Sequence, residues 1–381
     1  MRCSEGLIVG PGQKTRLCGL AVPRQSSVCK EVMDKEYNAS SEDGHCSFRV
    51  VYGDGVQSGH MRRIGRLGIK GMRKENDLEA SNVMIGLSTR SMSCSFRHNI
   101  AGMDFSKISL LTQLYDKGLI DAYKMSMYDS TASTASDSLL LPYVSEETHN
   151  YTRYMVLGSF EPEWTQDASS KLMGFPIYRG KEMHAMGSHM DPEFMMSVGN
   201  MNRIVLDRHI YTLVETIMIG KKMYGKQVGA KQDNGQATRR FSAIIDTGST
   251  AMRIPGDMYA IYIEELTQWA RMYGFRVVDE GKLCLVHMKN DISKVIMDAK
   301  AAQRFPSIGV ILQGNSKSVE IPLLETGDIL MEANQVCLKL EVSRPNNEQI
   351  VLGIPFFSHR YVSLDLGKRA GTVSGILSTS T

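Results

Sequence analysis

The sequence predicts a mainly β protein of the β-rich α+β class, and three observations support that prediction. Most apolar segments are short and rich in β-branched or aromatic residues, as strands are, and few segments carry a helical repeat. The 381 residues include 34 glycines, which favours many turns. A hydrophobic content of 42% is enough to build a core and excludes wholesale disorder.

The amino-terminal part predicts a hairpin followed by a short helix. Residues 48–52 are β-branched and aromatic, residues 53–55 form a turn, and residues 64–69 continue as the return strand. Residues 106–115 place apolar side chains on one helical face, and Gly118 lies just beyond that segment.

The clearest helix is expected directly after Pro255. Its apolar residues recur at helical spacing across 259–273, and Gly274 ends the repeat. Residues 129–138 form a loop of Ser, Thr and Ala with nothing to bury. A Met-rich stretch over 169–201 lacks periodicity and is interpreted as an insertion.

Charge and hydropathy argue against nucleic-acid binding and against a membrane-spanning helix. Lys and Arg number 44 against 41 Asp and Glu, which gives a net charge of +3 spread along the chain. A nucleic-acid-binding protein would cluster its basic residues, so we expect no nucleic-acid partner. No stretch approaches the roughly 18 apolar residues of a membrane helix, so we expect no membrane span.

One segment carries chemistry. An apolar strand over residues 241–245 leads into a tight turn that begins with Asp246 and continues through Thr247, Gly248 and Ser249. Gly248 lets the backbone approach closely, and the Ser249 hydroxyl can hydrogen-bond the carboxylate. Taken alone, the triplet equally fits an Asp that caps a surface turn. What favours a catalytic role is a second apolar element about a hundred residues later, which ends at Gly353.

With these two elements the chain resembles the pepsin-like aspartic peptidases. Residues 246–249 and 351–353 match the catalytic loop of the second lobe of that family and its apolar-apolar-Gly element. In the first lobe, Tyr52, Gly53, Asp54 and Gly55 resemble the substrate-binding flap, and residues 100–105 resemble the apolar-apolar-Gly element. The resemblance covers about residues 7–375 and implies a bilobal fold. It assigns residues 1–160 to a first lobe, 161–203 to a connecting insertion, and 204–381 to a second lobe.

The first catalytic loop departs from the family pattern. The best candidate has Gly10 where the family has Asp, Pro11 where it has Thr, and only Gly12 in common. The strands that precede this loop in the family are also absent, so the first lobe is expected to be truncated at its start. In pepsin, two carboxylates share one proton and act together. Because Asp246 alone acts at most as a base, we expect the encoded chain to be inactive.

The seven cysteines contain no C-x-x-C pair, which argues against zinc ribbons and thioredoxin-like motifs. The resemblance places the second-lobe disulfide at Cys284 and Cys337, and we expect Cys29 to pair with Cys46 because both lie just before the flap strand. His184 and His189 are interpreted as surface residues rather than metal ligands. The family resemblance implies peptide-bond hydrolysis at acidic pH without metal or cofactor.

The resemblance further implies a monomer that acts on a peptide or protein substrate in the secretory pathway, outside the cell or in a vacuole or lysosome. Against secretion, the apolar run over residues 7–9 is far shorter than a signal-peptide core. Two alternatives to an active enzyme stay open. One is a non-catalytic pseudo-peptidase that binds peptides or protein partners through the cleft between the lobes. The other is a truncated or misassembled gene product.

Overall fold

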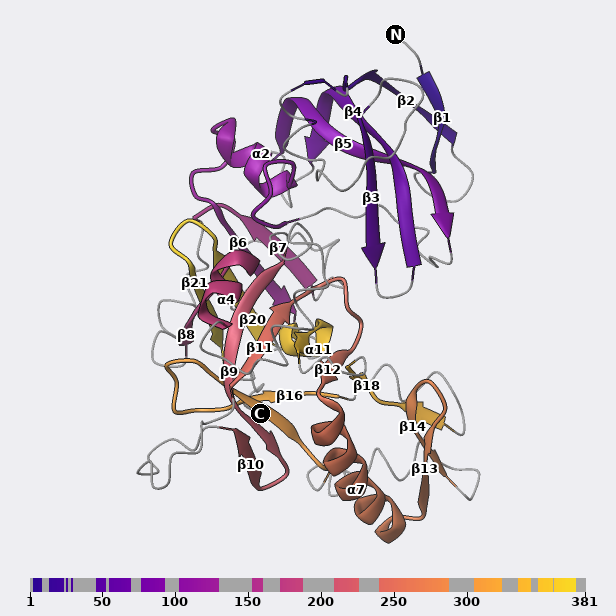
Figure 1. Cartoon of the computed structure of the whole chain (residues 1–381), viewed down its shortest axis with the longest axis vertical. Coiled ribbons are helices and arrows are strands. Elements are labelled where there is room, and N and C mark those ends of the chain that lie inside the picture. The colour runs from indigo at the N-terminus through magenta and orange to yellow at the C-terminus, as the bar shows by residue number, and fades with distance from the viewer. Residues whose placement is uncertain are drawn as a thin grey trace, which may run out of the picture. The chain divides into compact units, whose positions relative to one another are not determined.

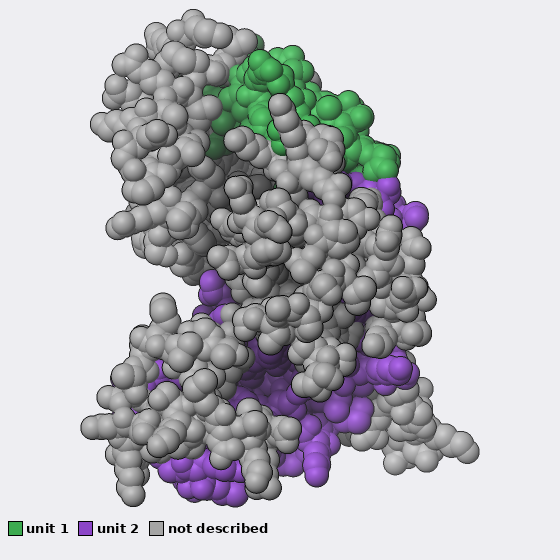
Figure 2. Space-filling model, turned by 180° about the vertical axis from the view of Figure 1, so that it is seen from behind, with its two compact units in different colours: residues 1–123 green, residues 124–381 purple. Residues whose placement is uncertain are grey.

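The computed structural model is rich in strands and divides into two compact units (Figures 1 and 2). Unit 1 comprises Met1–Tyr123 and unit 2 comprises Lys124–Thr381. The structure describes residues 3–8, 14–23, 25–26, 29, 46–52, 55–69, 77–92, 103–129, 153–159, 172–187, 209–225, 240–287, 305–323, 335–343, 349–358 and 360–374.

Unit 1 contains one antiparallel sheet of five strands. Its strands pair in the order β1 (Cys3–Ile8), β2 (Lys14–Ala21), β4 (Gly55–Ile69) and β3 (Ser47–Tyr52), and β5 (Leu78–Met92) also pairs with β4. Tyr52 pairs with Gly55 at the end of the β3–β4 ladder. The predicted hairpin is therefore confirmed, although its return strand already begins at Gly55 rather than at residue 64.

The short helix α2 (Leu110–Asp116) is anchored to β5 through the buried side chain of Gln113. The Gln113 amide accepts a hydrogen bond from the Met84 N–H at 2.7 Å and donates to the Met84 carbonyl at 3.0 Å and the Ile108 carbonyl at 2.9 Å. This side chain therefore pairs with the strand backbone much as a neighbouring strand would, which satisfies buried polar groups on both sides.

The helix predicted from residue 106 begins later, at Leu110, for a local reason. The Asp104 carboxylate accepts hydrogen bonds from both the N–H and the hydroxyl of Ser106, which fixes a turn there. Ser109 then caps the helix, because its hydroxyl accepts from the Thr112 N–H at 3.2 Å. Side-chain bonds of this kind compete with helix formation and delay the first turn.

In unit 2, a five-stranded antiparallel sheet joins segments far apart in the chain (Figure 1). Its order is β7 (Arg153–Leu157), β6 (Lys124–Asp129), β20 (Arg360–Asp365), β21 (Ala370–Ser374) and β8 (Leu172–Pro176). Strand β6 thus pairs with the carboxyl-terminal strand β20 on one side and with β7 on the other. The predicted lobe boundaries at residues 160 and 203 stay predictions.

The eight-stranded sheet of unit 2 holds most of its core. Its order is β16 (Val319–Ile321), β15 (Ile308–Leu312), β9 (Ile210–Ile219), β11 (Phe241–Ile245), β19 (Ile350–Leu352), β12 (Met252–Ile254) and β18 (Leu340–Val342), with β10 (Lys222–Gly225) paired to β9. Every residue of β15 is buried. A continuous apolar run of this kind is typical of a strand covered on both faces.

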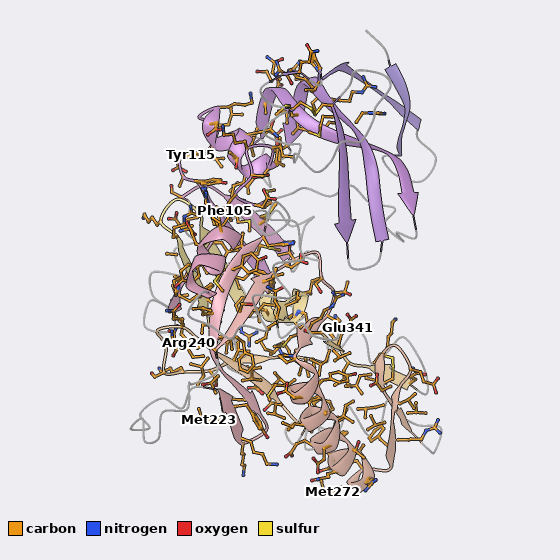
Figure 3. The ribbon with its side chains drawn as sticks, viewed as in Figure 1. Phe105, Tyr115, Met223, Arg240, Met272 and Glu341 are labelled. Carbon is orange, nitrogen blue, oxygen red and sulfur yellow. A yellow bond between two sulfur atoms is a disulfide. The ribbon has the colours of Figure 1, made fainter. Side chains whose placement is uncertain are left out.

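The predicted helix after Pro255 is confirmed as α7 (Gly256–Met272). Pro255 occupies the position before the helix, and Gly274 has φ +76° just after it, a conformation that favours glycine. The helix buries Met258, Tyr259, Tyr262, Leu266, Trp269 and Ala270. Met272 is 74% exposed and lies at the carboxyl end of the helix (Figure 3).

A three-stranded sheet follows α7 and consists of β13 (Phe275–Asp279), β14 (Leu283–His287) and β17 (Gln335–Cys337). Two further short helices are α4 (Gly180–Gly187) and α11 (Ile354–Phe357). The predicted β-rich class is confirmed. The predicted loop beyond residue 129 lies outside the described residues. The predicted insertion at 169–201 contains β8 and α4 and is otherwise outside them.

Two tyrosines of α7 should make the protein less stable in alkali. Burial raises the pKa of Tyr259, and the negative charge of Asp279 raises it further. The Tyr259 hydroxyl donates a hydrogen bond to the Asp279 carboxylate at 3.2 Å. Burial also raises the pKa of Tyr262. Each raised pKa contributes stability below about pH 10, where a tyrosine in the unfolded chain is still protonated, and that stability is lost as the pH rises further.

We therefore expect the free energy of unfolding to fall between about pH 10 and 11, by up to about 1.4 kcal/mol per pH unit for each of the two tyrosines. Tyr262→Phe should flatten this slope, which urea unfolding at several pH values would measure. The control is Tyr115→Phe, because the Tyr115 side chain is 44% exposed. Equal slopes for Tyr262→Phe and the unmodified chain would contradict the prediction.

Candidate functional site

Asp246 stands at the end of β11, and the backbone around it orients its carboxylate. The Asp246 N–H donates to the Leu352 carbonyl at 3.0 Å. Oδ1 of Asp246 accepts a hydrogen bond from the Gly248 N–H at 2.8 Å, and the Asp246 carbonyl accepts one from the Ser249 N–H at 3.2 Å. Asp246 is half-buried and Thr247 is exposed. The predicted turn therefore exists and holds a partly accessible carboxylate.

The strands on either side of this turn do not pair with each other. Instead, β19 passes between them, parallel to β11 with Ile245 opposite Leu352 and antiparallel to β12 with Arg253 opposite Val351. The chain leaves β11, makes the Asp246 turn, and returns on the far side of a third strand. The turn is consequently held by a strand that lies about a hundred residues later in the sequence.

Gly353 brings β19 into close contact with the Asp246 turn. A Cβ atom at this position would lie 2.2 Å from the Ala251 carbonyl oxygen and 2.6 Å from that of Ser249. The next residue, Ile354, donates its N–H to the Ser249 carbonyl at 2.8 Å. The two elements that the sequence analysis singled out, residues 246–249 and 351–353, therefore meet in the structure, and only glycine fits their contact.

The structure corrects the expected role of the Ser249 hydroxyl. That hydroxyl donates to the Ala251 carbonyl at 2.8 Å rather than to the Asp246 carboxylate. The carboxylate accepts from the backbone of Gly248 instead, because the turn aims that N–H at it. Ser249 thus stabilises the return of the chain from the turn towards β12.

The sequence analysis missed a buried polar cluster at the ends of these strands opposite the Asp246 turn. The Ser343 hydroxyl donates to the Gln349 carbonyl at 2.6 Å, and the Gln349 amide donates to the Ser242 hydroxyl at 3.4 Å. The Ser343 N–H also donates to the Ile254 carbonyl at 2.8 Å. These bonds connect the ends of β11, β12 and β19. In the sequence, the cluster is indicated only by a glutamine directly before an apolar strand. The spacing of apolar residues does not show that this glutamine is buried.

The family comparison agrees with this geometry. Residues 205–374 match the family model for eukaryotic aspartyl proteases, and the match includes both Asp246 and Gly353. Over residues 205–374 the chain therefore resembles the eukaryotic aspartyl protease family. No curated protein matches the chain well enough to serve as a relative.

Solved structures show the same fold over most of the chain. Basic 7S globulin from soybean has a TM-score of 0.58 at 13% identity, over 96% of this chain and 83% of that one. Conglutin gamma from lupine seeds has a TM-score of 0.57 at 13% identity, over 93% of this chain and 81% of that one. An aspartic proteinase from Irpex lacteus has a TM-score of 0.52 at 14% identity, over 88% of this chain and 82% of that one. The pepsin-like fold inferred from the sequence is confirmed.

The other predicted site residues belong to unit 1. Tyr52 and Gly55 face each other across the β3–β4 ladder, whereas Gly53 and Asp54 lie outside the described residues. The degenerate loop, Gly10 to Gly12, also lies outside them. It connects two strands that pair directly, with Ile8 opposite Lys14.

Both predicted disulfides are confirmed. Cys284 and Cys337 face each other on β14 and β17 with Cα atoms 3.9 Å apart, well within the limit of about 7 Å for a bond. Cys29 and Cys46 are bonded with a Cα separation of 5.6 Å, in a small core cluster that includes Val22.

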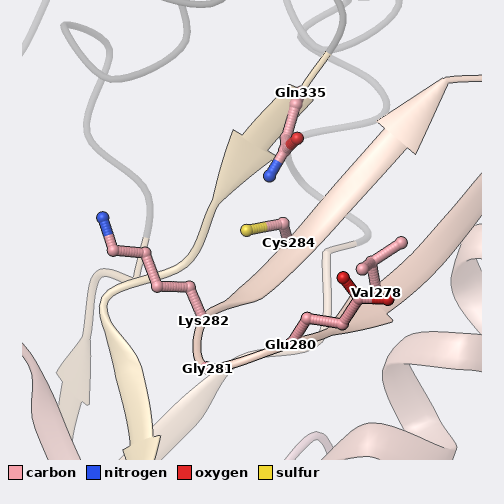
Figure 4. Close-up of a pocket in the computed structure, with 6 residues that line it drawn as sticks. All are labelled: Val278, Glu280, Gly281, Lys282, Cys284 and Gln335. Carbon is pink, nitrogen blue, oxygen red and sulfur yellow. The ribbon is translucent and has the colours of Figure 1, made fainter.

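A pocket of about 440 Å³ lies beside the disulfide of the three-stranded sheet (Figure 4). Its lining residues are Val278, Glu280, Gly281, Lys282, Cys284 and Gln335. The pocket is thus built on the β13–β14 hairpin and contains no residue of the Asp246 turn.

No group of three or more His, Cys, Asp or Glu side chains in the described part of the chain is arranged to hold a metal ion. None of the described helices combines the length and the apolar character needed to cross a membrane.

The close contact at Gly353 leads to a prediction about stability. Gly353→Ala places a methyl group against two backbone oxygens that cannot move aside without opening the Asp246 turn. We expect a loss of about 1–3 kcal/mol in the free energy of unfolding, as for overpacked cores. The control is Gly309→Ala in β15, because a Cβ atom there meets ordinary contacts of 3.5–3.6 Å. Denaturant unfolding that shows equal losses for the two variants would contradict the prediction.

Proposed function

We propose that the chain is a pepsin-like aspartic endopeptidase homologue that, as encoded, is inactive in peptide-bond hydrolysis. The Asp246 turn carries this proposal, because its carboxylate is held in place by the Gly248 N–H and by the strand that ends at Leu352. We assign Asp246 the role of the second-lobe carboxylate. Thr247, Gly248 and Ser249 support its turn.

The proposed loss of hydrolysis follows from the chemistry of the paired carboxylates. In the family mechanism one carboxylate activates water while the other polarises the peptide carbonyl and later protonates the leaving nitrogen. With Gly10 and Pro11 in the first loop, the second partner is missing. Loss of one acid–base partner typically lowers the rate by about 10²–10⁴.

The rival function is a non-catalytic pseudo-peptidase that binds peptides or protein partners, and such binding does not require the Asp246 carboxylate as a catalytic group. The occupants of the first loop favour this role, since neither Gly10 nor Pro11 can replace a carboxylate. The flap candidates, from Tyr52 to Gly55, would contact the bound peptide in either case.

Binding of a statine-type peptide inhibitor at acidic pH tests the proposal. The proposed function predicts that the unmodified chain binds it and that Asp246→Ala abolishes binding, because the inhibitor hydroxyl takes the place of the water held by the catalytic carboxylate. Binding that survives Asp246→Ala supports the pseudo-peptidase. The absence of binding by the unmodified chain overturns the proposed function.

We further propose that the protein works as a monomer in the secretory pathway, outside the cell or in a vacuole or lysosome, without a cofactor. The two disulfides support this location, because such bonds persist in oxidising compartments. Peptide mapping of the protein isolated from cells without reduction tests it. Free thiols at Cys284 and Cys337 would contradict it.

A further inference from the structure

Arg360 is a buried arginine whose hydrogen bonds go to backbone carbonyls. Arg360 is 1% exposed and is the first residue of β20. Nη1 donates to the carbonyls of Phe356 and Ser358, each at 3.4 Å, and Nη2 donates to the carbonyl of Glu320 in β16. Its Nε has no hydrogen-bond partner among the described residues. The guanidinium therefore joins three separate points of the backbone.

Burying a charged guanidinium destabilises the folded state unless neighbouring groups compensate its charge. Two of its acceptors, the Phe356 and Ser358 carbonyls, lie at the carboxyl end of α11, where backbone oxygens lack partners within the helix and carry negative partial charge. Burial lowers the pKa of Arg360 to about 10, which still leaves the side chain charged at neutral and acidic pH. Arg360 is thus suited to hold the end of α11.

The other end of α11 is bonded to the Asp246 turn. The helix begins directly after Gly353, and its first residue, Ile354, donates its N–H to the Ser249 carbonyl at 2.8 Å. The Ser358 N–H closes the helix by donating to the Ile354 carbonyl at 3.0 Å. A single short turn of backbone therefore connects the guanidinium with the loop that carries Asp246.

We propose that Arg360 is a positioning residue for the Asp246 turn, acting through α11. Without the guanidinium, the Phe356 and Ser358 carbonyls lose the hydrogen bonds from Nη1, and α11 is less firmly held against Ser249. The inference rests on the proposed function only for the role of Asp246 in binding. The hydrogen bonds that connect Arg360, α11 and Ser249 exist whether or not the protein is active. The competing interpretation is that Arg360 stabilises the whole fold without a particular effect on the turn.

Hydrogen–deuterium exchange separates these interpretations. Arg360→Met removes the guanidinium, and Arg360→Lys keeps a charge but loses the planar fork. The control is Arg253→Met: Arg253 lies in β12 of the eight-stranded sheet and its guanidinium bonds the Glu341 carboxylate at 2.8 Å instead of α11. Mass spectrometry would follow peptides that cover residues 241–251 and 350–358, with residues 210–219 of β9 as the internal reference.

We expect exchange over residues 241–251 and 350–358 to be at least about tenfold faster in Arg360→Met, beyond any change over 210–219. Arg360→Lys should fall between Arg360→Met and the unmodified chain, and Arg253→Met should resemble the unmodified chain. Exchange that rises equally in all three segments overturns the inference. If Arg360→Met does not fold, Arg360→Lys decides by the same comparison.

Inhibitor binding adds a functional readout. At acidic pH, Arg360→Met should bind a statine-type peptide about tenfold more weakly than Arg253→Met does, because small displacements of a site weaken its contacts. Arg360→Lys should restore part of the binding. Unchanged binding in Arg360→Met, in a chain that does bind, overturns the inference. Should the unmodified chain bind no inhibitor, the proposed function fails, and the exchange experiment still decides the role of Arg360.

Discussion

The unmodified chain is expected to leave a quenched peptide substrate intact between about pH 3 and pH 5, the range in which the pepsin dyad works. Asp246 is held in a usable turn, but a lone carboxylate cannot both activate water and supply the acid for the leaving nitrogen. The expected loss is on the order of 10²–10⁴ in rate from the missing partner. A fluorogenic assay with and without a statine-type inhibitor measures it.

The control for this assay is Asp246→Ala, which should give the same background as the unmodified chain. Turnover that the inhibitor suppresses and that Asp246→Ala abolishes would overturn the prediction. Such a result would mean that a second carboxylate reaches Asp246, for instance from another subunit.

Replacing Gly10→Asp and Pro11→Thr together should give little or no rescue. The strands on either side of this loop pair directly, with Ile8 opposite Lys14, whereas β19 separates the strands around Asp246. Among the described residues, no strand lies between β1 and β2 as β19 lies between β11 and β12, so we expect a carboxylate introduced at position 10 to be held less firmly than Asp246. A displacement of about 1 Å can lower a rate about 10²-fold. Full activity in the double variant would show that this framework is unnecessary.

The sequence predicted those parts of the fold that local physics determines. The apolar repeat and the flanking Pro255 and Gly274 are enough to define α7, because helix contacts lie within a few residues of each other. The β3–β4 hairpin is local in the same sense. The Asp246 turn was predictable because an apolar strand that ends in Asp-Thr-Gly is uncommon and because Gly353 follows in the expected order.

What the sequence could not predict depends on contacts between distant segments. Nothing in the periodicity of β6 indicates that it pairs with β20, since strand pairing depends on which edges meet after folding. Local side-chain competition also escaped prediction, as at Ser106, where bonds to the Asp104 carboxylate delay helix α2. Arg360 gave no signal, because an arginine that opens a strand is ordinarily expected at the surface.

Removing the disulfide between Cys284 and Cys337 is expected to cause the largest loss of stability, about 4 kcal/mol in the free energy of unfolding, because the bond closes a loop of 53 residues. Most of this effect comes from the unfolded chain, whose freedom the cross-link restricts. The disulfide between Cys29 and Cys46 spans only 17 residues, for which the same entropy argument gives about 3 kcal/mol.

The two Cys→Ala double variants, compared by urea unfolding without reductant, test this order. Loss of packing increases the effect of removing the pair at Cys29 and Cys46, and so opposes this order. These two residues are 0% exposed within a core cluster, and their truncation to Ala also removes buried contacts. Reduction cleaves both disulfides of the unmodified chain and the remaining one of each variant while keeping the other sulfur atoms. The difference between each reduced variant and the reduced unmodified chain therefore measures the packing part, which can be subtracted. If the pair at Cys29 and Cys46 still contributes more after that correction, chain entropy does not control the stability of these cross-links.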